Sequence, residues 1–191
     1  MGKNRTLTIN DTQNFILKGS NSIQIGIYLL LFVFILKSLL DGFLSDVSML
    51  GMMSIEIIEL AAFIFISLFI LLSGLAVLFS NRRRTRRAGY KLMNKKTFRQ
   101  FAFYLGWTLP AFLIIYSIAN GGYSMFAGVS FLFLLGTILI GLNSSKKKAL
   151  YILSGLSIGL AVISYLIPSY WYSSILIMGG AFIVYGIMIR K

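Results

Sequence analysis

The chain contains six long apolar runs, and this feature limits its fold more than any other. A helix needs roughly 20 apolar residues to cross the ~30 Å hydrocarbon core of a bilayer. Backbone groups in lipid must be satisfied within the protein, and the runs do not alternate as barrel strands do, so each run is predicted to be a helix. The expected spans cover residues 22–43, 55–79, 101–119, 123–142, 149–167 and 170–189.

The composition agrees with a chain that uses lipid as its solvent. Hydrophobic residues make up 58% of the sequence and charged residues 12%, whereas a soluble domain has about 45–50% and about 25%. We therefore expect an all-α polytopic membrane protein with one transmembrane domain over residues 1–191. Residues 1–21 are polar, and the first run has no cleavage pattern after it, so we expect an uncleaved first span rather than a signal peptide.

The basic residues predict the orientation of the spans. Except for Lys37, all of them lie in the terminal segments, in the second loop or in the fourth loop, while the other three loops carry none. Lysine and arginine near the ends of spans stay on the cytoplasmic side. Six spans with both termini in the cytoplasm place every basic loop on the cytoplasmic side. A bacterial inner membrane is the expected location.

Glycine recurs at corresponding places in the runs and suggests three helical hairpins in parallel orientation. Each outgoing span carries a glycine early, and each returning span carries one near its cytoplasmic end. The positions are Gly26, Gly106 and Gly155 in the outgoing spans and Gly74, Gly136 and Gly186 in the returning spans. Glycine is also common in membrane helices generally, so chance competes with a true repeat.

The third hairpin resembles a known family. Its first helix contains Gly155, its turn contains Pro168, and its return helix contains Gly179, Gly180 and Gly186. Together with three hairpins in 191 residues, this pattern resembles the HdeD-like membrane protein family of bacteria, which is implicated in acid stress. The first hairpin departs from the pattern because it has no proline at its turn. The resemblance implies a six-span protein without established catalytic residues.

The charged residues within or beside the spans gather around the first hairpin, where Asp46 lies in the loop and four others form a candidate cluster. Lys37 and Asp41 are four residues apart, and Glu56 and Glu59 are three apart, so each pair shares a helix face. A tight hairpin would bring Lys37 opposite Glu59 and Asp41 opposite Glu56. A charge in hydrocarbon costs about 2.5–3.5 kcal/mol, so it pairs or faces a cavity. The cluster is therefore a structural salt bridge, a set of side chains that extend to the outer interface, or part of an ion pathway.

Two further features of the spans have both a structural and a functional interpretation. Pro110 removes a backbone hydrogen bond and predicts a kink in the third span, which is either a packing feature or a hinge at a substrate site. Thr108 is placed to recapture a freed carbonyl. The spacing Gly155-x-x-x-Gly159 lets helices approach closely. It serves internal packing or association with another helix equally well.

The second loop and the residues after it are strongly basic. Their main expected contact is the anionic lipid of the cytoplasmic leaflet, and an acidic partner protein is the alternative. Nucleic acid is an unlikely partner because a location beside the membrane already explains the charge. The residues expected to make this contact are Arg82, Arg83, Arg84, Arg86, Arg87, Lys95 and Lys96.

Enzyme chemistry finds little support in the residue types present. The sequence has no cysteine and no histidine, which excludes disulfides, thiolate nucleophiles and the usual transition-metal ligands. We expect no cofactor and a non-enzymatic protein that acts by association, as a stress-related module, an accessory subunit of a membrane complex or a homo-oligomer. The alternatives are a small transporter or channel that uses the charge cluster, and a membrane-perturbing effector.

Overall fold

The computed structural model describes residue 17 and the ranges 19–44, 55–79, 95–120, 126–141 and 147–190. These residues form α-helices with one short 3-10 helix, and no strand occurs among them. The all-α class is therefore confirmed for the described part of the chain. The elements are α1 (Gly19–Leu44), α2 (Ile55–Phe79), α4 (Lys95–Asn120), α5 (Ala127–Gly141), α6 (Lys147–Leu166), η4 (Pro168–Tyr170) and α7 (Trp171–Arg190).

Three helical segments are long and apolar enough to cross a membrane. They are Gly19–Gly42, Lys148–Leu166 and Pro168–Ile189, and two shorter apolar helices lie at Ile64–Phe79 and Ala127–Gly141. Large apolar side chains lie exposed along these helices, for example Ile152 and Leu166. These three helices therefore have the length and composition of membrane spans.

The predicted spans overlap the observed helices, and the closest match is α2. The span predicted at 55–79 has the bounds of α2. Helix α4 begins at Lys95 rather than at residue 101, because lysine and arginine are good helix formers and can continue a helix beyond the apolar layer. Helix α5 is shorter than the predicted 123–142, since it begins at Ala127 and residues 121–125 lie outside the described ranges.

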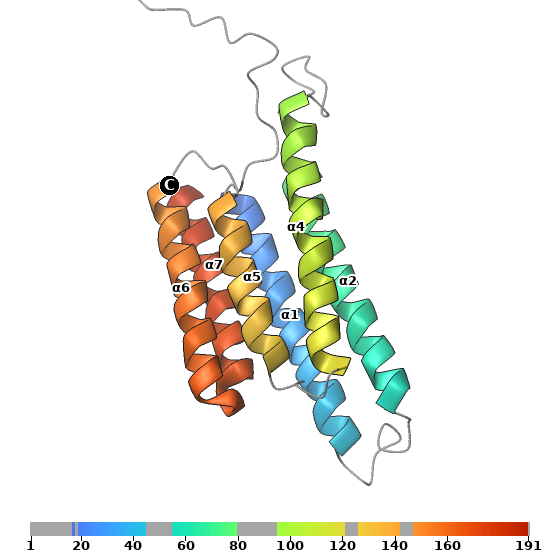
Figure 1. Ribbon diagram of the computed structural model, residues 1–191. Coiled ribbons are helices and arrows are strands. Elements are labelled where there is room, and N and C mark those ends of the chain that lie inside the picture. The colour runs from blue at the N-terminus through green and yellow to red at the C-terminus, as the bar shows by residue number, and fades with distance from the viewer. Residues whose placement is uncertain are drawn as a thin grey trace, which may run out of the picture.

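The helices form one elongated bundle in which consecutive helices run in opposite directions (Figure 1). Helices α1, α5, α6 and α7 lie together, and α2 and α4 lie beside them (Figure 1). The most extensive contacts join α1 to α7 and α5 to α6, while α2 and α4 touch each other over a smaller area. The bundle is therefore closed by pairing the first helix with the last.

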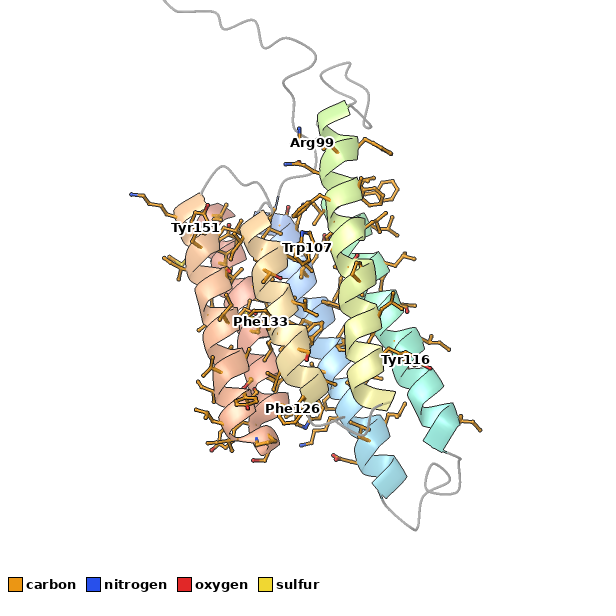
Figure 2. The ribbon with its side chains drawn as sticks, in the orientation of Figure 1. Arg99, Trp107, Tyr116, Phe126, Phe133 and Tyr151 are labelled. Carbon is orange, nitrogen blue, oxygen red and sulfur yellow. The ribbon has the colours of Figure 1, made fainter. Side chains whose placement is uncertain are left out.

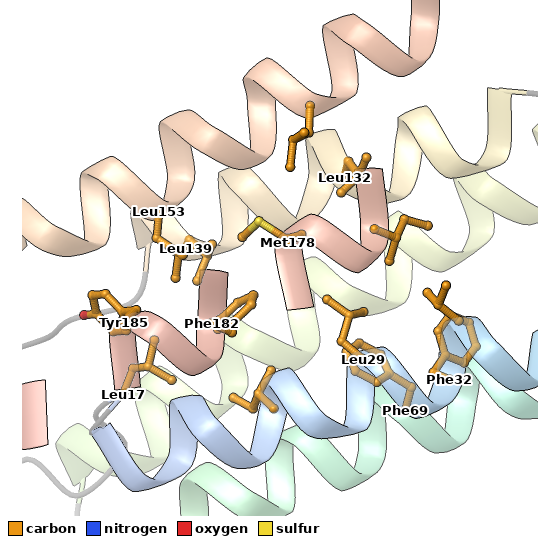
Figure 3. Close-up of a cluster of buried hydrophobic side chains, with 14 of the residues drawn as sticks. Leu17, Leu29, Phe32, Phe69, Leu132, Leu139, Leu153, Met178, Phe182 and Tyr185 are labelled. Atoms are coloured by element: carbon orange, nitrogen blue, oxygen red, sulfur yellow. The ribbon is translucent and has the colours of Figure 1, made fainter. Parts of the chain in front are cut away.

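A continuous apolar core runs through the bundle. Leu29 of α1, Leu132 of α5 and Met178 of α7 are fully buried and lie close together (Figure 3). The rings of Phe32, Phe69 and Phe131 have centroids 5.5–6.4 Å apart and join α1, α2 and α5. Offset and edge-to-face rings attract each other beyond simple burial. This aromatic cluster connects α2 to the four-helix part of the bundle.

Glycine brings the backbones of α1 and α7 into direct contact. A β-carbon added to Gly26 would lie 2.7 Å from the carbonyl oxygen of Gly179, and one added to Gly186 would lie 2.5 Å from that of Gly19. Real side chains do not approach so closely, so both positions require glycine at this helix separation. The hydroxyl of Ser22 donates to the carbonyl of Phe182 across the same interface, at 2.7 Å.

Helices α5 and α6 pack by the same means. A β-carbon on Gly136 would lie 2.8 Å from the side chain of Ile158 and 3.3 Å from the carbonyl oxygen of Ser154. The hydroxyls of Ser154 and Ser157 donate to the carbonyls of Gly136 and Leu132, each at 2.7 Å. In an apolar environment these bonds satisfy polar groups that lipid cannot. We call α1·α7 and α5·α6 the glycine–serine pairs.

The predicted hairpins are present as neighbouring helices but not as equivalent units. Consecutive helices do contact each other, as hairpins require, although the largest interfaces lie between helices of different hairpins. Gly26, the early glycine of the first outgoing helix, is enclosed by α7, whereas Gly106 and Gly155 have open space beside them. The three early glycines thus have different surroundings, so their shared position does not reflect a shared packing role.

Candidate functional site

Lys37 lies in α1, and the structure gives it an aromatic partner. Its ammonium nitrogen is 4.4 Å from the centroid of the Tyr172 ring in α7. A cation over a ring face is stabilised by about 0.5–1 kcal/mol when exposed and by more when desolvated. Tyr172 meets Trp171 nearly at right angles, with centroids 6.0 Å apart. We call this cluster of Lys37, Trp171 and Tyr172 the Lys37–Tyr172 site.

The register of α1 and α7 shows how deep Lys37 lies. The close contacts make Gly19 level with Gly186 and Gly26 level with Gly179. Continuing this antiparallel register along α1 brings Lys37 level with Pro168, at the turn between α6 and α7. Side chains in a helix lean toward its N-terminus, which carries the ammonium back toward Tyr172. The Lys37–Tyr172 site therefore lies at one end of the bundle rather than at its middle.

We call this end of the bundle the aromatic end and the opposite end the basic end. The aromatic residues that gather at the aromatic end are Phe126, Tyr165, Tyr170, Trp171 and Tyr172. Phe126 and Tyr165 have ring centroids 5.7 Å apart, and Tyr170 is exposed. Aromatic residues with a polar edge favour the level of the lipid headgroups.

The other three charges of the predicted cluster are described to different extents. Asp41 is exposed one turn beyond Lys37, and these two side chains form no ion pair in the described part of the molecule. Glu56 and Glu59 lie in α2, but their side chains are outside the described set. The pairs Lys37–Glu59 and Asp41–Glu56 therefore stay predictions, as does the ion pathway that depends on them. No group of three or more possible metal ligands occurs among the described residues.

Helix α4 continues through Pro110 to Asn120. The hydroxyl of Thr108 donates to the carbonyls of Tyr104 and Leu105, at 2.9 and 3.2 Å. The carbonyl that loses its partner to Pro110 is that of Gly106, four residues earlier, so Thr108 satisfies different groups from the one expected. Pro110 thus lies within a continuous helix, and its use as a hinge stays a prediction.

The basic segment is described only where it enters α4. Residues 82–87 lie outside the described ranges, and Lys95 and Lys96 belong to the first turn of α4 without described side chains. Arg99 follows them and is exposed near the start of α4, where this helix extends beyond the neighbouring helices (Figure 2). The expected contact of this segment with anionic lipid or an acidic partner stays a prediction, as does the effector hypothesis.

The glycine pair of α6 points away from the bundle. Gly155 and Gly159 are exposed, and a β-carbon added to either would meet nothing within 4 Å. Ile152, with 74% of its surface exposed, lies one turn before Gly155, and Ser154 and Ser157 point inward to α5. The Gly155-x-x-x-Gly159 spacing therefore does not serve internal packing among the described residues, and association with another helix is the use that remains.

Sequence reasoning missed Tyr172 as the partner of Lys37. The aromatic cluster at residues 170–172 is visible in the sequence, but hairpin topology directs attention to the neighbouring helix α2. The contact between α1 and α7 joins the two ends of the chain. The available signal was the equal seven-residue spacing of Gly19 and Gly26 in α1 and of Gly179 and Gly186 in α7.

Comparison with known proteins adds no relative from which function could be transferred. No protein-family model, no curated protein and no solved structure matches this chain. The resemblance to the HdeD-like family stays a prediction for this reason.

Proposed function

We propose that this chain is a non-enzymatic membrane protein that acts by binding a second membrane protein through the outward face of α6. The observation that carries the proposal is the open surface over Gly155 and Gly159, which are both exposed on one face of α6 at the spacing that allows close helix contact. An accessory subunit of a larger complex, or a stress-related module, has this architecture.

The physical reason for choosing α6 is the way helices associate in lipid. Lipid tails are as apolar as leucine, so helices gain little from hiding apolar surface, and close van der Waals packing decides which faces pair. Gly155 and Gly159 leave the backbone of α6 uncovered, and Ile152, Leu156 and Ile163 are exposed beside them. A partner helix with small residues at its contact face could approach this surface closely.

The proposal includes six spans with both termini in the cytoplasm of a bacterial cell. The starts of α1, α4 and α6 and the end of α7 lie at the same end of the bundle (Figure 1). The basic residues of the sequence belong to the segments at that end, apart from Lys37. The positive-inside rule supports a cytoplasmic location for it and an inner membrane as the host.

Cross-linking from single cysteines tests the association, because the chain has no cysteine of its own. A photoreactive maleimide is attached to Ile152→Cys on α6 and, as a matched control, to Leu71→Cys on α2, which is also well exposed. After illumination in native membranes, we expect a discrete protein adduct from position 152 only. Mass spectrometry then identifies the partner or a second copy of this chain.

A second variant separates a seated partner from a chance neighbour. Gly155→Ile with Gly159→Ile adds bulk to this face, and the new β-carbons meet nothing within 4 Å, so the protein should fold normally. The adduct should disappear if the partner helix sits on the glycines. Equal adducts from positions 152 and 71, or an adduct that survives the double substitution, would rule the proposal out.

A further inference from the structure

We propose that Lys37 and Asp41 form a binding site for the headgroup of a zwitterionic phospholipid with a primary amine, the phosphoethanolamine class. Lys37 would hold the phosphate and Asp41 the ammonium. This inference depends on the membrane character of the bundle and not on the association through α6, so either proposal can fail alone.

The first argument is the place of Lys37. Every other basic residue of the sequence lies in the terminal segments or in the two basic loops. Lys37 lies near the aromatic end, where the orientation rule does not require a positive charge. Holding a charge at the edge of the hydrocarbon layer is costly unless the charge has a partner. The position therefore calls for a ligand or a structural counter-charge.

The second argument is the way the ammonium is held. It lies over the Tyr172 ring at 4.4 Å, and Trp171, which supports that ring, packs its β-carbon against Gly128 of α5. A ring face attracts the positive charge but accepts none of the three N–H donors in the strong way that an oxygen does. The cluster thus fixes the ammonium while leaving hydrogen-bonding capacity for phosphate oxygens.

The third argument is the neighbouring carboxylate. Asp41 shares the helix face of Lys37, and such pairs commonly form ion pairs, yet these two side chains do not join in the described structure. Asp41 is exposed and lies about 6 Å further along the axis of α1, toward the end of the bundle. A cation at the deeper position and an anion further out match a phosphate and the amine attached beyond it.

The chemistry of the amine makes the proposal specific. A primary ammonium can donate hydrogen bonds to the Asp41 carboxylate, whereas the quaternary ammonium of a choline headgroup cannot. A glycerol headgroup offers Asp41 no positive charge. We therefore expect phosphatidylethanolamine to bind better than phosphatidylcholine or phosphatidylglycerol with the same acyl chains.

Native mass spectrometry of the delipidated full chain in mild detergent measures this preference. Each of the three dioleoyl lipids is titrated separately, and the fraction of protein with one bound lipid is recorded. We expect the ethanolamine lipid to bind about threefold more tightly than the choline lipid, the size of one exposed charge pair. Equal binding of these two lipids by the unmodified protein would overturn the proposal.

Three variants assign the roles of the two residues. Asp41→Asn should lower binding of the ethanolamine lipid to the level of the choline lipid and leave the choline lipid unchanged. Lys37→Gln should weaken all three lipids, because all three carry the phosphate. Lys148→Gln, an exposed lysine at the basic end, is the control and should keep the ethanolamine preference. If Lys37→Gln keeps the same binding curves, the site is wrong.

Two more variants distinguish the site from a folding effect and from an internal ion pair. Lys37→Arg retains a cation that can lie on the Tyr172 ring. This variant should fold and should keep the ethanolamine preference that Lys37→Gln loses. Glu59→Gln should leave the preference intact. A rise in lipid binding on Glu59→Gln would mean that Glu59 neutralises Lys37, and the proposal would then fall.

Discussion

The α1·α7 and α2·α4 pairs hold their helices together by opposite means. In α1·α7, glycines let the two backbones touch, and Ser22 donates across to the carbonyl of Phe182. In α2·α4, the ring of Tyr104 lies between the helices, 3.0 Å from the position of a β-carbon on Gly74. Its hydroxyl donates to the carbonyl of Ile70 at 2.9 Å and lies 3.0 Å from the hydroxyl of Ser73.

The comparison of α1·α7 with α2·α4 shows two ways in which the distance between helices can be determined when lipid is the solvent. Where the facing residues are glycines, many backbone atoms meet, and each adds a small dispersion attraction. Where one large side chain bridges the helices, fewer atoms meet, and a few hydrogen bonds fix the spacing. We therefore expect the first pair to be sensitive to added volume and the second to be sensitive to lost polar groups.

The largest expected effect comes from adding one methyl group to the α1·α7 pair. In Gly186→Ala the new carbon would lie 2.5 Å from the Gly19 carbonyl oxygen and 2.9 Å from the backbone nitrogen of Ile23. These atoms belong to the backbone and cannot move without separating the helices. Overpacking of this kind costs about 1–3 kcal/mol. Unfolding of the purified protein in denaturing detergent measures it.

Gly180→Ala is the matched control on the same helix. A β-carbon there meets nothing within 4 Å, and alanine is a better helix former than glycine. The free energy of unfolding should stay the same or rise slightly. If Gly186→Ala and Gly180→Ala have equal stability, glycine does not set the distance between α1 and α7.

A smaller effect is expected from the serines of the α5·α6 pair. Ser157→Ala removes the hydrogen bond to the carbonyl of Leu132 across the interface. Side-chain hydrogen bonds between membrane helices contribute about 0.6 kcal/mol on average and at most about 1.7 kcal/mol. The same unfolding measurement should show a loss of that size.

Thr137→Val in α5 provides the comparison for this prediction. Its hydroxyl donates at 2.8 Å to the carbonyl of Leu134, in its own helix, so it joins no helices. Valine has nearly the same shape, and we expect little change in stability. An equal loss in both variants would mean that the serine bond contributes no more than a bond within one helix.

The positions of most helices could be predicted from the sequence, because hydropathy alone marks a membrane helix. The bounds of α2 follow directly from its apolar run. The face that each helix turns inward could not be predicted in this way, since apolar residues surround helices such as α2 and α7 on every side. Gly155 and Gly186 are both glycines within apolar runs, yet Gly155 faces open space and Gly186 lies against the backbone of α1.

The candidate site shows the same limit. Lys37 and Asp41 were singled out as charges within or beside a span, and their shared face follows from their spacing. The Tyr172 partner could not be predicted, because it depends on which two helices of the bundle pair. The pairing of α1 with α7 depends on several glycines that act together over two turns, so it cannot be predicted from any single residue.

The clearest test of the difference between the two helix pairs is Tyr104→Phe, whose loss of stability should be no larger than that of Ser157→Ala. The ring remains against Gly74, while the bonds to Ile70 and Ser73 are lost. Ser73 keeps its hydrogen bond to the carbonyl of Phe69 in its own helix, at 2.8 Å. The loss should therefore be about 0.6 kcal/mol, but the spacing of α2 and α4 should become less well defined.

Distances between spin labels detect that change where unfolding barely does. Labels on exposed Ile57→Cys and Leu113→Cys report on α2 and α4, and labels on exposed Ile27→Cys and Ile177→Cys report on α1 and α7. Tyr104→Phe should broaden the first distance distribution and leave the second unchanged, since the α1·α7 contact does not involve a bridging side chain. A narrow α2–α4 distribution in the variant would show that ring packing alone fixes α4 on α2. Both helix pairs would then be held by close packing, and hydrogen bonds would not distinguish them.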